Sequence, residues 1–212
     1  MKRDELNVFD SENKTYTERS MPYEKYFGEM ALSKPQIKQR IEFARQMEDK
    51  LLTFMTLWGM VKALSDDEIF LRTQLQEFYF EVTTQYIVTD DYIQKHGEEF
   101  ADNFIDATKR HSKDPWYTSD DRMKFDAENE ANDILNYSDF QDAIEAGYTH
   151  KKWVAIMDKK TRDTHRQVNE TVIPIEDTFE VGETLLRFPG DTEFDTSGGR
   201  EIVNCRCSLE YL

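Results

Sequence analysis

Hydrophobic side chains recur every three or four residues through most of the first 145 positions, and the clearest series follows Ser33. Gln36 stands three residues after Ser33, the spacing at which two such side chains form a capping box at the start of a helix. The apolar positions behind this box are Ile37, Ile41, Ala44, Met47, Leu51, Met55, Trp58 and Val61. Their spacing predicts a long amphipathic helix.

The same periodicity predicts further helices. A second capping box, from Ser65 to Glu68, stands in front of another apolar series. Pro115 lies in a connector, because its ring prevents a helix from continuing. The helical segments predicted around this connector are 93–105, 120–136 and 138–146. Gly97 is a possible break in the first of them, and Gly147 is expected to end the last.

The pattern changes after residue 147, where short apolar runs alternate with turn-forming residues. We predict strands at 152–157 and 202–209, an extended stretch at 171–175 and a helical turn at 161–168. The chain therefore predicts an α+β fold, in which a mainly helical N-terminal two-thirds is followed by a small, irregular, strand-containing C-terminal module. The expected organisation is a flexible arm (1–32), a helical domain (33–118) and the C-terminal module (119–212).

Composition and charge narrow the class of protein. Hydrophobic residues make up 38% of the chain and charged residues 33%, which is typical of a globular protein. No apolar run reaches the ~18–20 residues of a membrane helix, and no apolar segment follows Met1–Glu5, so we expect neither a membrane span nor a secretory signal. The protein is therefore expected to start in a cytoplasm.

The net charge of −16 is concentrated in residues 66–147. An acidic surface repels phosphate backbones, so broad nucleic-acid binding by this part of the chain is not expected. Two interpretations of the acidic stretch stay open. It is either a solvated face that keeps the protein in solution or a docking surface for a basic partner.

The densest group of chemically useful side chains lies near the C-terminus. At helical spacing, Asp158, Arg162 and His165 would share one face. If the last strand lies beside that helix, Cys205 and Cys207 would both point towards His165. Two thiolates and one imidazole are a plausible zinc set, with Asp158 or water as the fourth ligand. A disulfide between residues i and i+2 would be strained, so we expect a reduced pair.

Three interpretations of this group compete. The cysteines can be small buried hydrophobes, with an Arg162–Asp158 ion pair orienting His165. They can bind a structural metal together with His165, although zinc sites usually separate their cysteines by two to four residues. They can also form a catalytic Cys-His pair, for which the sequence offers no evident orienting group. The chain has no Gly-rich phosphate loop, no His-Glu-x-x-His and no deaminase signature.

Residues 122–212 resemble the phage Mu F-like head morphogenesis family, the minor head proteins of tailed phages and prophages. Matching elements are Ala127 to Glu130, Gly147, Lys151 to Trp153, Asp158, Thr161-Arg162, His165, Val172 to Ile175, Phe179, Phe188 to Asp191 and Asn204 to Cys207. The start of the helical part, Tyr26 to Met30 with Leu32-Ser33, is also similar to prophage members. One departure is Asn169-Glu170, where relatives tend to carry Asn-Gly.

The resemblance implies a non-enzymatic minor head protein, present in small copy number and associated with the portal, that acts in head assembly or in keeping and guiding DNA at the exit. The implied partners are portal, capsid or scaffold proteins, with DNA contacted indirectly and no membrane. The implied location is the host cytoplasm during assembly and then the interior of the virion head. The structural motif of the module would consist of Trp153, Asp158, Thr161, Arg162, His165, Asn204, Cys205, Arg206 and Cys207.

Two other classes of function stay open. The first is a metal-dependent enzyme or toxin-like effector that uses Asp158, His165, Cys205 and Cys207, with zinc as the expected metal. The second is an interaction protein that acts on host machinery through the acidic helices.

Overall fold

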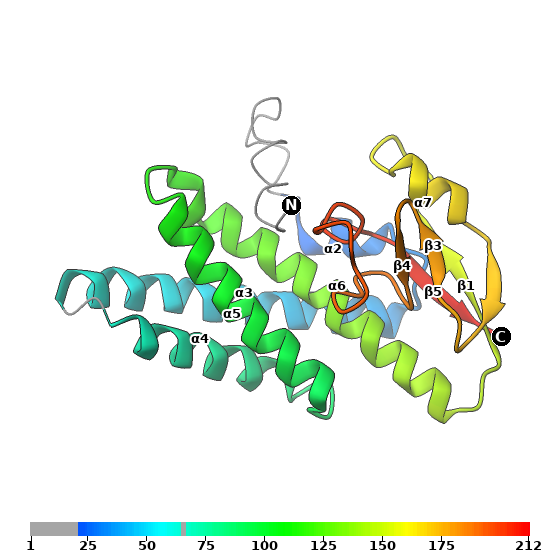
Figure 1. Ribbon diagram of the computed structural model, residues 1–212, viewed down its shortest axis with the longest axis horizontal. Coiled ribbons are helices and arrows are strands. Elements are labelled where there is room, and N and C mark those ends of the chain that lie inside the picture. Colours follow the sequence, from blue (N-terminus) through cyan, green and yellow to red (C-terminus); the bar gives the residue numbers. More distant parts are fainter. Residues whose placement is uncertain (1–20, 65–66) are drawn as a thin grey trace. The chain divides into compact units, whose positions relative to one another are not determined.

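The computed structural model describes residues 21–64 and 67–212, so most of the expected N-terminal arm lies outside the described residues (Figure 1). The α+β fold predicted from the sequence is confirmed, because helices fill the first part of the chain and two small sheets follow. Contacts divide the chain into two compact units. One contains residues up to 41 together with 129–212, and the other contains 42–128. The domain boundaries at 32 and 118 stay a prediction.

The 42–128 unit is helical. It contains the larger part of α3 (Lys34–Leu64), all of α4 (Glu68–Thr83), α5 (Asp91–Arg110) and the 3-10 turn η2 (Pro115–Thr118), and the beginning of α6 (Asp120–Glu145). Arg122 is buried and donates hydrogen bonds to Thr108 Oγ1 and to the carbonyl oxygens of Tyr117 and Phe104, with Asp126 as its ion-pair partner. These bonds satisfy a charge that would otherwise be costly to bury.

The structure confirms one predicted helix start and corrects other predictions about the helices. The Ser33 cap is confirmed, since the Gln36 side chain accepts from the backbone N–H of Ser33. The predicted N-cap of the next helix is wrong, because Asp67 caps α4 by accepting from the backbone N–H of Phe70. Ser65 itself lies outside the described residues. Gly97 does not interrupt α5. A Cβ at that position would lie 2.8 Å from the ring of Tyr79, so this glycine permits close helix packing.

The predicted break between residues 136 and 138 is also wrong, because α6 runs without interruption to Glu145. Asn136 and Ser138 are common helix-capping residues, yet Asn136 is buried inside α6 and its side chain bonds the C-terminal segment of the chain. A tertiary partner for the amide therefore overrides its local preference for a helix end.

The other unit is built on a three-stranded antiparallel sheet in the order β2-β1-β5. The strands are β1 (His150–Val154), β2 (Val172–Pro174) and β5 (Ser208–Tyr211), and a separate hairpin joins β3 (Phe179–Val181) to β4 (Thr184–Leu186). In Figure 1 the red β5 lies beside the yellow β1, and Trp153 pairs with Leu209 in this register. The helices of this unit are α2 (Tyr23–Gly28), the first part of α3, the last part of α6 and α7 (Asp163–Val168). No helix in the described part of the chain is long and apolar enough to cross a membrane.

The final predicted strand, 202–209, is largely wrong. Only its last two residues belong to β5, and the segment from Ile202 to Cys207 is a turn followed by irregular backbone. Asn204 has a φ of 56°, in the left-handed region that a strand does not use. The two cysteines therefore converge through a turn and not through strand alternation.

Candidate metal centre

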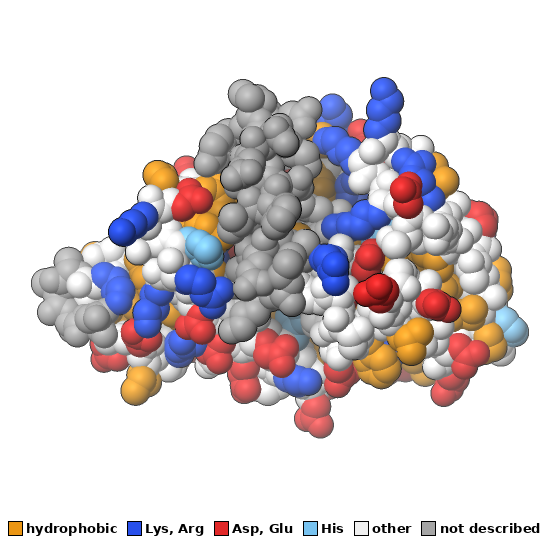
Figure 2. Space-filling view, turned by 45° about the horizontal axis from the view of Figure 1, so that its top comes forward, with side chains coloured by type: hydrophobic (Ala, Val, Ile, Leu, Met, Phe, Trp, Pro, Cys, Tyr) orange, Lys and Arg blue, Asp and Glu red, His pale blue; other side chains and the backbone are white. Residues whose placement is uncertain are grey.

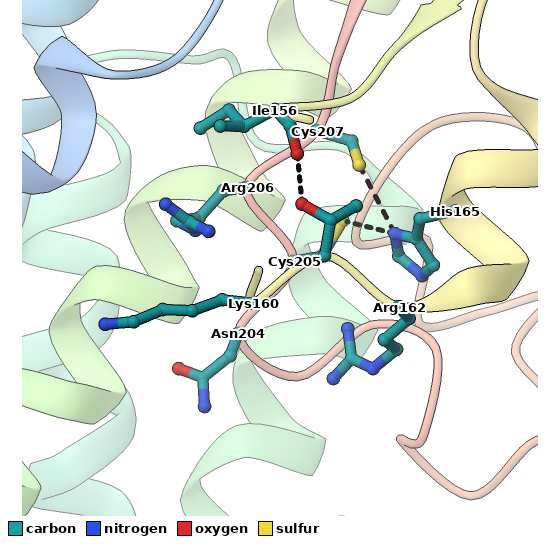
Figure 3. A pocket seen from close by; sticks show the side chains of 9 residues that line it. Ile156, Lys160, Arg162, His165, Asn204, Cys205, Arg206 and Cys207 are labelled. Atoms are coloured by element: carbon teal, nitrogen blue, oxygen red, sulfur yellow. Dashed lines mark hydrogen bonds between the residues drawn. The ribbon is translucent and has the colours of Figure 1, made fainter. Parts of the chain in front are cut away.

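His165 on α7 and the two cysteines before β5 form a compact buried group. The exposed fractions are 2% for His165, 3% for Cys205 and 2% for Cys207. His165 Nδ1 lies 3.3 Å from Cys207 Sγ and 3.6 Å from Cys205 Sγ (Figure 3). Among the described residues, the ligand atoms of these three side chains all lie within 4.8 Å of one another. Both thiols are free, as the sequence predicts.

A row of asparagines on α6 holds the cysteine segment in place. Asn129 Oδ1 accepts from the backbone N–H of Asn204, and Asn132 Nδ2 donates to the carbonyl oxygen of Cys205. Asn136 Nδ2 donates to the carbonyl oxygen of Cys207 at 3.4 Å. These positions are spaced three and four residues apart, so they lie on one face of the helix. Sequence analysis missed this face, although three asparagines at helical spacing could have indicated it.

The turn before α7 is organised by Asp158. Its Oδ1 accepts from the backbone N–H groups of Lys160 and Thr161, and its Oδ2 pairs with Arg206 at 2.6 Å. The predicted shared helix face is wrong, because α7 begins only at Asp163 and Asp158 lies in the preceding turn. The Arg162 guanidinium instead donates to the carbonyl oxygen of Val203. Asp158 therefore links the turn to the cysteine segment and does not orient His165.

Glu201 orients the imidazole from its other side. His165 Nε2 lies 3.1 Å from Glu201 Oε2, which also accepts from Thr164 Oγ1 at 2.8 Å. A Cβ at position 182 would lie 2.8 Å from Glu201 Oε1, so Gly182 leaves space for this carboxylate. The Trp153 ring packs edge-on against the imidazole. Sequence analysis missed Glu201, since nothing in its local pattern distinguishes it from other acidic loop residues.

The protonation states of His165, Cys205 and Cys207 depend on one another. The hydrogen bond from Cys207 lowers the pKa of Cys205 well below its usual range, against the effect of burial, and the neighbouring His165 lowers it further. The same hydrogen bond and burial raise the pKa of Cys207. Burial lowers the pKa of His165, but the charge and hydrogen bond of Cys205 and the hydrogen bond to Glu201 outweigh it and raise the value to about 9. The arrangement favours an imidazolium beside a thiolate at neutral pH.

A small pocket borders this group, and Figure 3 shows its side chains. It is lined by Ile156, Lys160, Thr161, Arg162, His165, Asn204, Cys205, Arg206 and Cys207. Three of these side chains are cationic and none is a carboxylate. Figure 2 shows Lys and Arg side chains gathered on part of the same unit's surface, in contrast to the strongly acidic composition of the chain.

Comparison with protein families identifies the chain. The model of the family described as Phage Mu protein F like protein matches residues 95–210, which is more than half of the chain. The chain belongs to this family. The resemblance drawn from the sequence motifs is therefore confirmed, and membership suggests a protein of phage head morphogenesis. Comparisons with curated proteins and with solved structures found no match.

The predicted motif of the Mu F-like module falls around one site. Thr161, Arg162, His165 and the Asn204–Cys207 segment line the pocket, while Trp153 packs on the imidazole. His165, Cys205 and Cys207 can bind a metal ion, whereas Asp158 is not a member of that group. Glu170, where the resemblance expects glycine, has a φ of 63°. The backbone of this Mu F-like protein thus takes the left-handed conformation that favours glycine at that position.

Proposed function

We propose that this protein is a non-enzymatic minor head protein of a tailed phage or prophage. It acts near the portal in head assembly, in genome retention and ejection, or in both, with portal, capsid or scaffold proteins as partners. It would leave the host cytoplasm by enclosure in the virion head, where its contact with packaged DNA is indirect. The observation that carries this proposal is the match to the Phage Mu F-like family over residues 95–210.

The contacts of the motif residues support a binding protein over an enzyme. Asp158 is engaged by Arg206 and by the turn that it caps, and Arg162 bonds the backbone of Val203. Asn204 is tied to α6 through its backbone. Side chains that are fully used in holding the chain together are typical of a structural motif. We further propose that the metal held by His165, Cys205 and Cys207 is zinc, which would fasten the segment before β5 to α7.

The experiment is a deletion of the gene from the phage or prophage, complemented in trans. Purified procapsids and mature heads are analysed by quantitative mass spectrometry, and DNA retention is measured by nuclease protection. We expect a few copies of the protein per head and a defect in assembly, retention or ejection without it. A paired complementation uses Cys207→Ser to disturb the C-terminal module and Glu180→Gln as an exposed control. Absence of the protein from both kinds of particle would overturn the proposal.

A metal-dependent enzyme or toxin-like effector is the second candidate, because the three-donor group borders a pocket. An effector of this kind would arrest the growth of an uninfected host that expresses it, and the arrest would disappear with His165→Gln. Equal growth of cells expressing either protein, at equal levels, would remove support for the effector.

A further inference from the structure

The distances around His165 match those of a zinc site. A tetrahedral zinc ion, with Zn–N near 2.0–2.1 Å and Zn–S near 2.3 Å, holds its nitrogen and sulfur ligands about 3.5 Å apart. The Nδ1 atom of His165 lies 3.3 Å from one cysteine sulfur and 3.6 Å from the other. Nδ1 therefore already lies at about the required separation from both sulfurs, and all three donor atoms lie within 4.8 Å of one another.

The hydrogen bonding of the imidazole agrees with this use. A carboxylate only accepts, so Glu201 takes the N–H of Nε2, and Nδ1 faces the two sulfurs. Metal binding would release the proton of Nδ1 and make its lone pair available as a ligand. In the metal-free protein the Cys205 thiolate accepts from Cys207 and from His165, whereas a metal ion would bind both sulfurs as thiolates. A carboxylate that accepts from the second nitrogen of a ligating histidine is the usual support for zinc in proteins.

The fourth ligand does not come from a described acidic, histidine or cysteine side chain. The group of such residues within reach contains three members in the described part of the chain, and Asp158 is engaged by Arg206. The pocket borders all three donors and is lined by the cations Lys160, Arg162 and Arg206, with no carboxylate. Two thiolates neutralise a divalent zinc, and Arg206 is already paired with Asp158 and Glu29. The charges of Lys160 and Arg162 therefore favour an anion at the remaining position.

We propose that His165 Nδ1, Cys205 and Cys207 bind one zinc ion whose fourth coordination position opens into this basic pocket and takes a small inorganic anion. The inference rests on the zinc assignment made above and is independent of the role in the phage head. Zinc sites with three protein ligands keep such an exchangeable position, while closed structural sites have four. The zinc ion would thus link the segment before β5 to α7 and also provide a binding position for a small anion.

The first experiment measures metal in the untagged, full-length protein, purified under reducing conditions and dialysed after zinc loading. We expect about one zinc per chain for the wild type. His165→Gln and Cys207→Ser should lose it, and the matched control Asp158→Asn should retain it. A wild type without zinc, or an Asp158→Asn variant that loses zinc while remaining folded by circular dichroism, would overturn the site as drawn.

The second experiment replaces zinc with cobalt(II) and follows the visible absorption of the tetrahedral ion during titration with sodium azide. We expect azide to shift the cobalt bands, and Lys160→Gln, which removes an exposed pocket cation, to weaken azide binding. Unchanged bands at saturating azide would mean a closed four-ligand site and would overturn the open position. Since both experiments use purified protein, their failure is distinguishable from a failure of the particle assay.

Discussion

His165 and Glu201 are 36 residues apart in the sequence, and Nε2 of the first lies 3.1 Å from Oε2 of the second. This contact fixes which ring nitrogen faces the cysteines. It also gives the group the orienting partner that the sequence did not reveal. The same contact lowers the pKa of Glu201, against the opposing effect of its partial burial, so the carboxylate is charged where it meets the ring.

Replacement of this partner should weaken metal binding without removing any ligand. We expect Glu201→Gln to lower zinc affinity by roughly 10–100-fold, because the amide supports the ring less well than a charged acceptor. Affinity is measured by competition with a chromophoric chelator, with Glu180→Gln as the exposed control. A merely structural role would change the melting of the metal-free protein and leave zinc affinity as it is. That outcome would contradict the assignment of Glu201 as a positioning residue.

Gly190 should tolerate no side chain. Its φ is 89°, and a Cβ there would lie 2.2 Å from Asp133 Oδ1 and 2.9 Å from Asp133 Cα, which belongs to the backbone of α6. Gly190→Ala should therefore lower the free energy of unfolding by more than the ~1–2 kcal/mol of backbone strain alone. Gly147→Ala is the matched control, since its φ is 81° and nothing lies within 4 Å. Equal losses for the two variants in urea unfolding would contradict the clash.

Glu170 should gain from replacement by glycine. The residue has a φ of 63°, and its carboxylate makes only an exposed contact with Lys152 at 3.4 Å. Glu170→Gly removes the strain at the small cost of that ion pair, so we expect a gain of about 0.5–1 kcal/mol in the free energy of unfolding. Thermal and urea unfolding measure the gain. A loss of stability would show that the carboxylate contributes more than its exposure indicates.

Lys151 should make stability rise with pH in the alkaline range. The side chain is fully buried over the rings of Phe140 and Phe179, and burial, partly offset by Asp191, lowers its pKa from 10.5 to about 8. Between these values the unfolded chain keeps a proton that the folded protein has lost, so stability increases from pH 8 to 10.5. Lys151→Met should remove this slope and stabilise the protein at pH 7 by about 1–3 kcal/mol.

The measurement is urea unfolding of the two proteins from pH 7 to 10, compared by difference so that other titrating groups cancel. Lys159→Met, at an exposed position, is the control for the loss of one positive charge. A difference between Lys151→Met and the wild type that does not change with pH would contradict the assignment.

Glu128 should have the opposite effect in the acidic and neutral range. The side chain is buried, and this burial raises its pKa from 4.5 to about 8. The folded protein therefore holds a proton that the unfolded chain releases, so stability falls as pH rises from 4.5 to 8. Glu128→Gln should match the wild type near pH 4.5 and exceed it at pH 8 by an amount on the order of a few kcal/mol. Glu99→Gln is the exposed control, and parallel curves for wild type and Glu128→Gln would refute the prediction.

The sequence determined those features that depend on neighbouring residues. Helical periodicity after Ser33 predicted α3, and the change of pattern after Gly147 predicted the small strand-containing module. The ordered motifs identified the family, because residue types at fixed spacing are visible without coordinates. The three residues that can bind a metal were also found in this way, since histidine and cysteine are few in the chain.

The tertiary structure decided how these residues meet. Asp158 does not lie on the predicted helix face, because its carboxylate caps a turn and pairs with Arg206. Glu201 belongs to the site because the chain folds back beside α7. No local sequence pattern predicts this proximity. Asn136 stayed inside α6 because its amide found a backbone partner 71 residues away. At Asn136 a long-range hydrogen bond outweighed the local preference, and at Asp158 and Glu201 contacts with residues distant in the sequence complete the site.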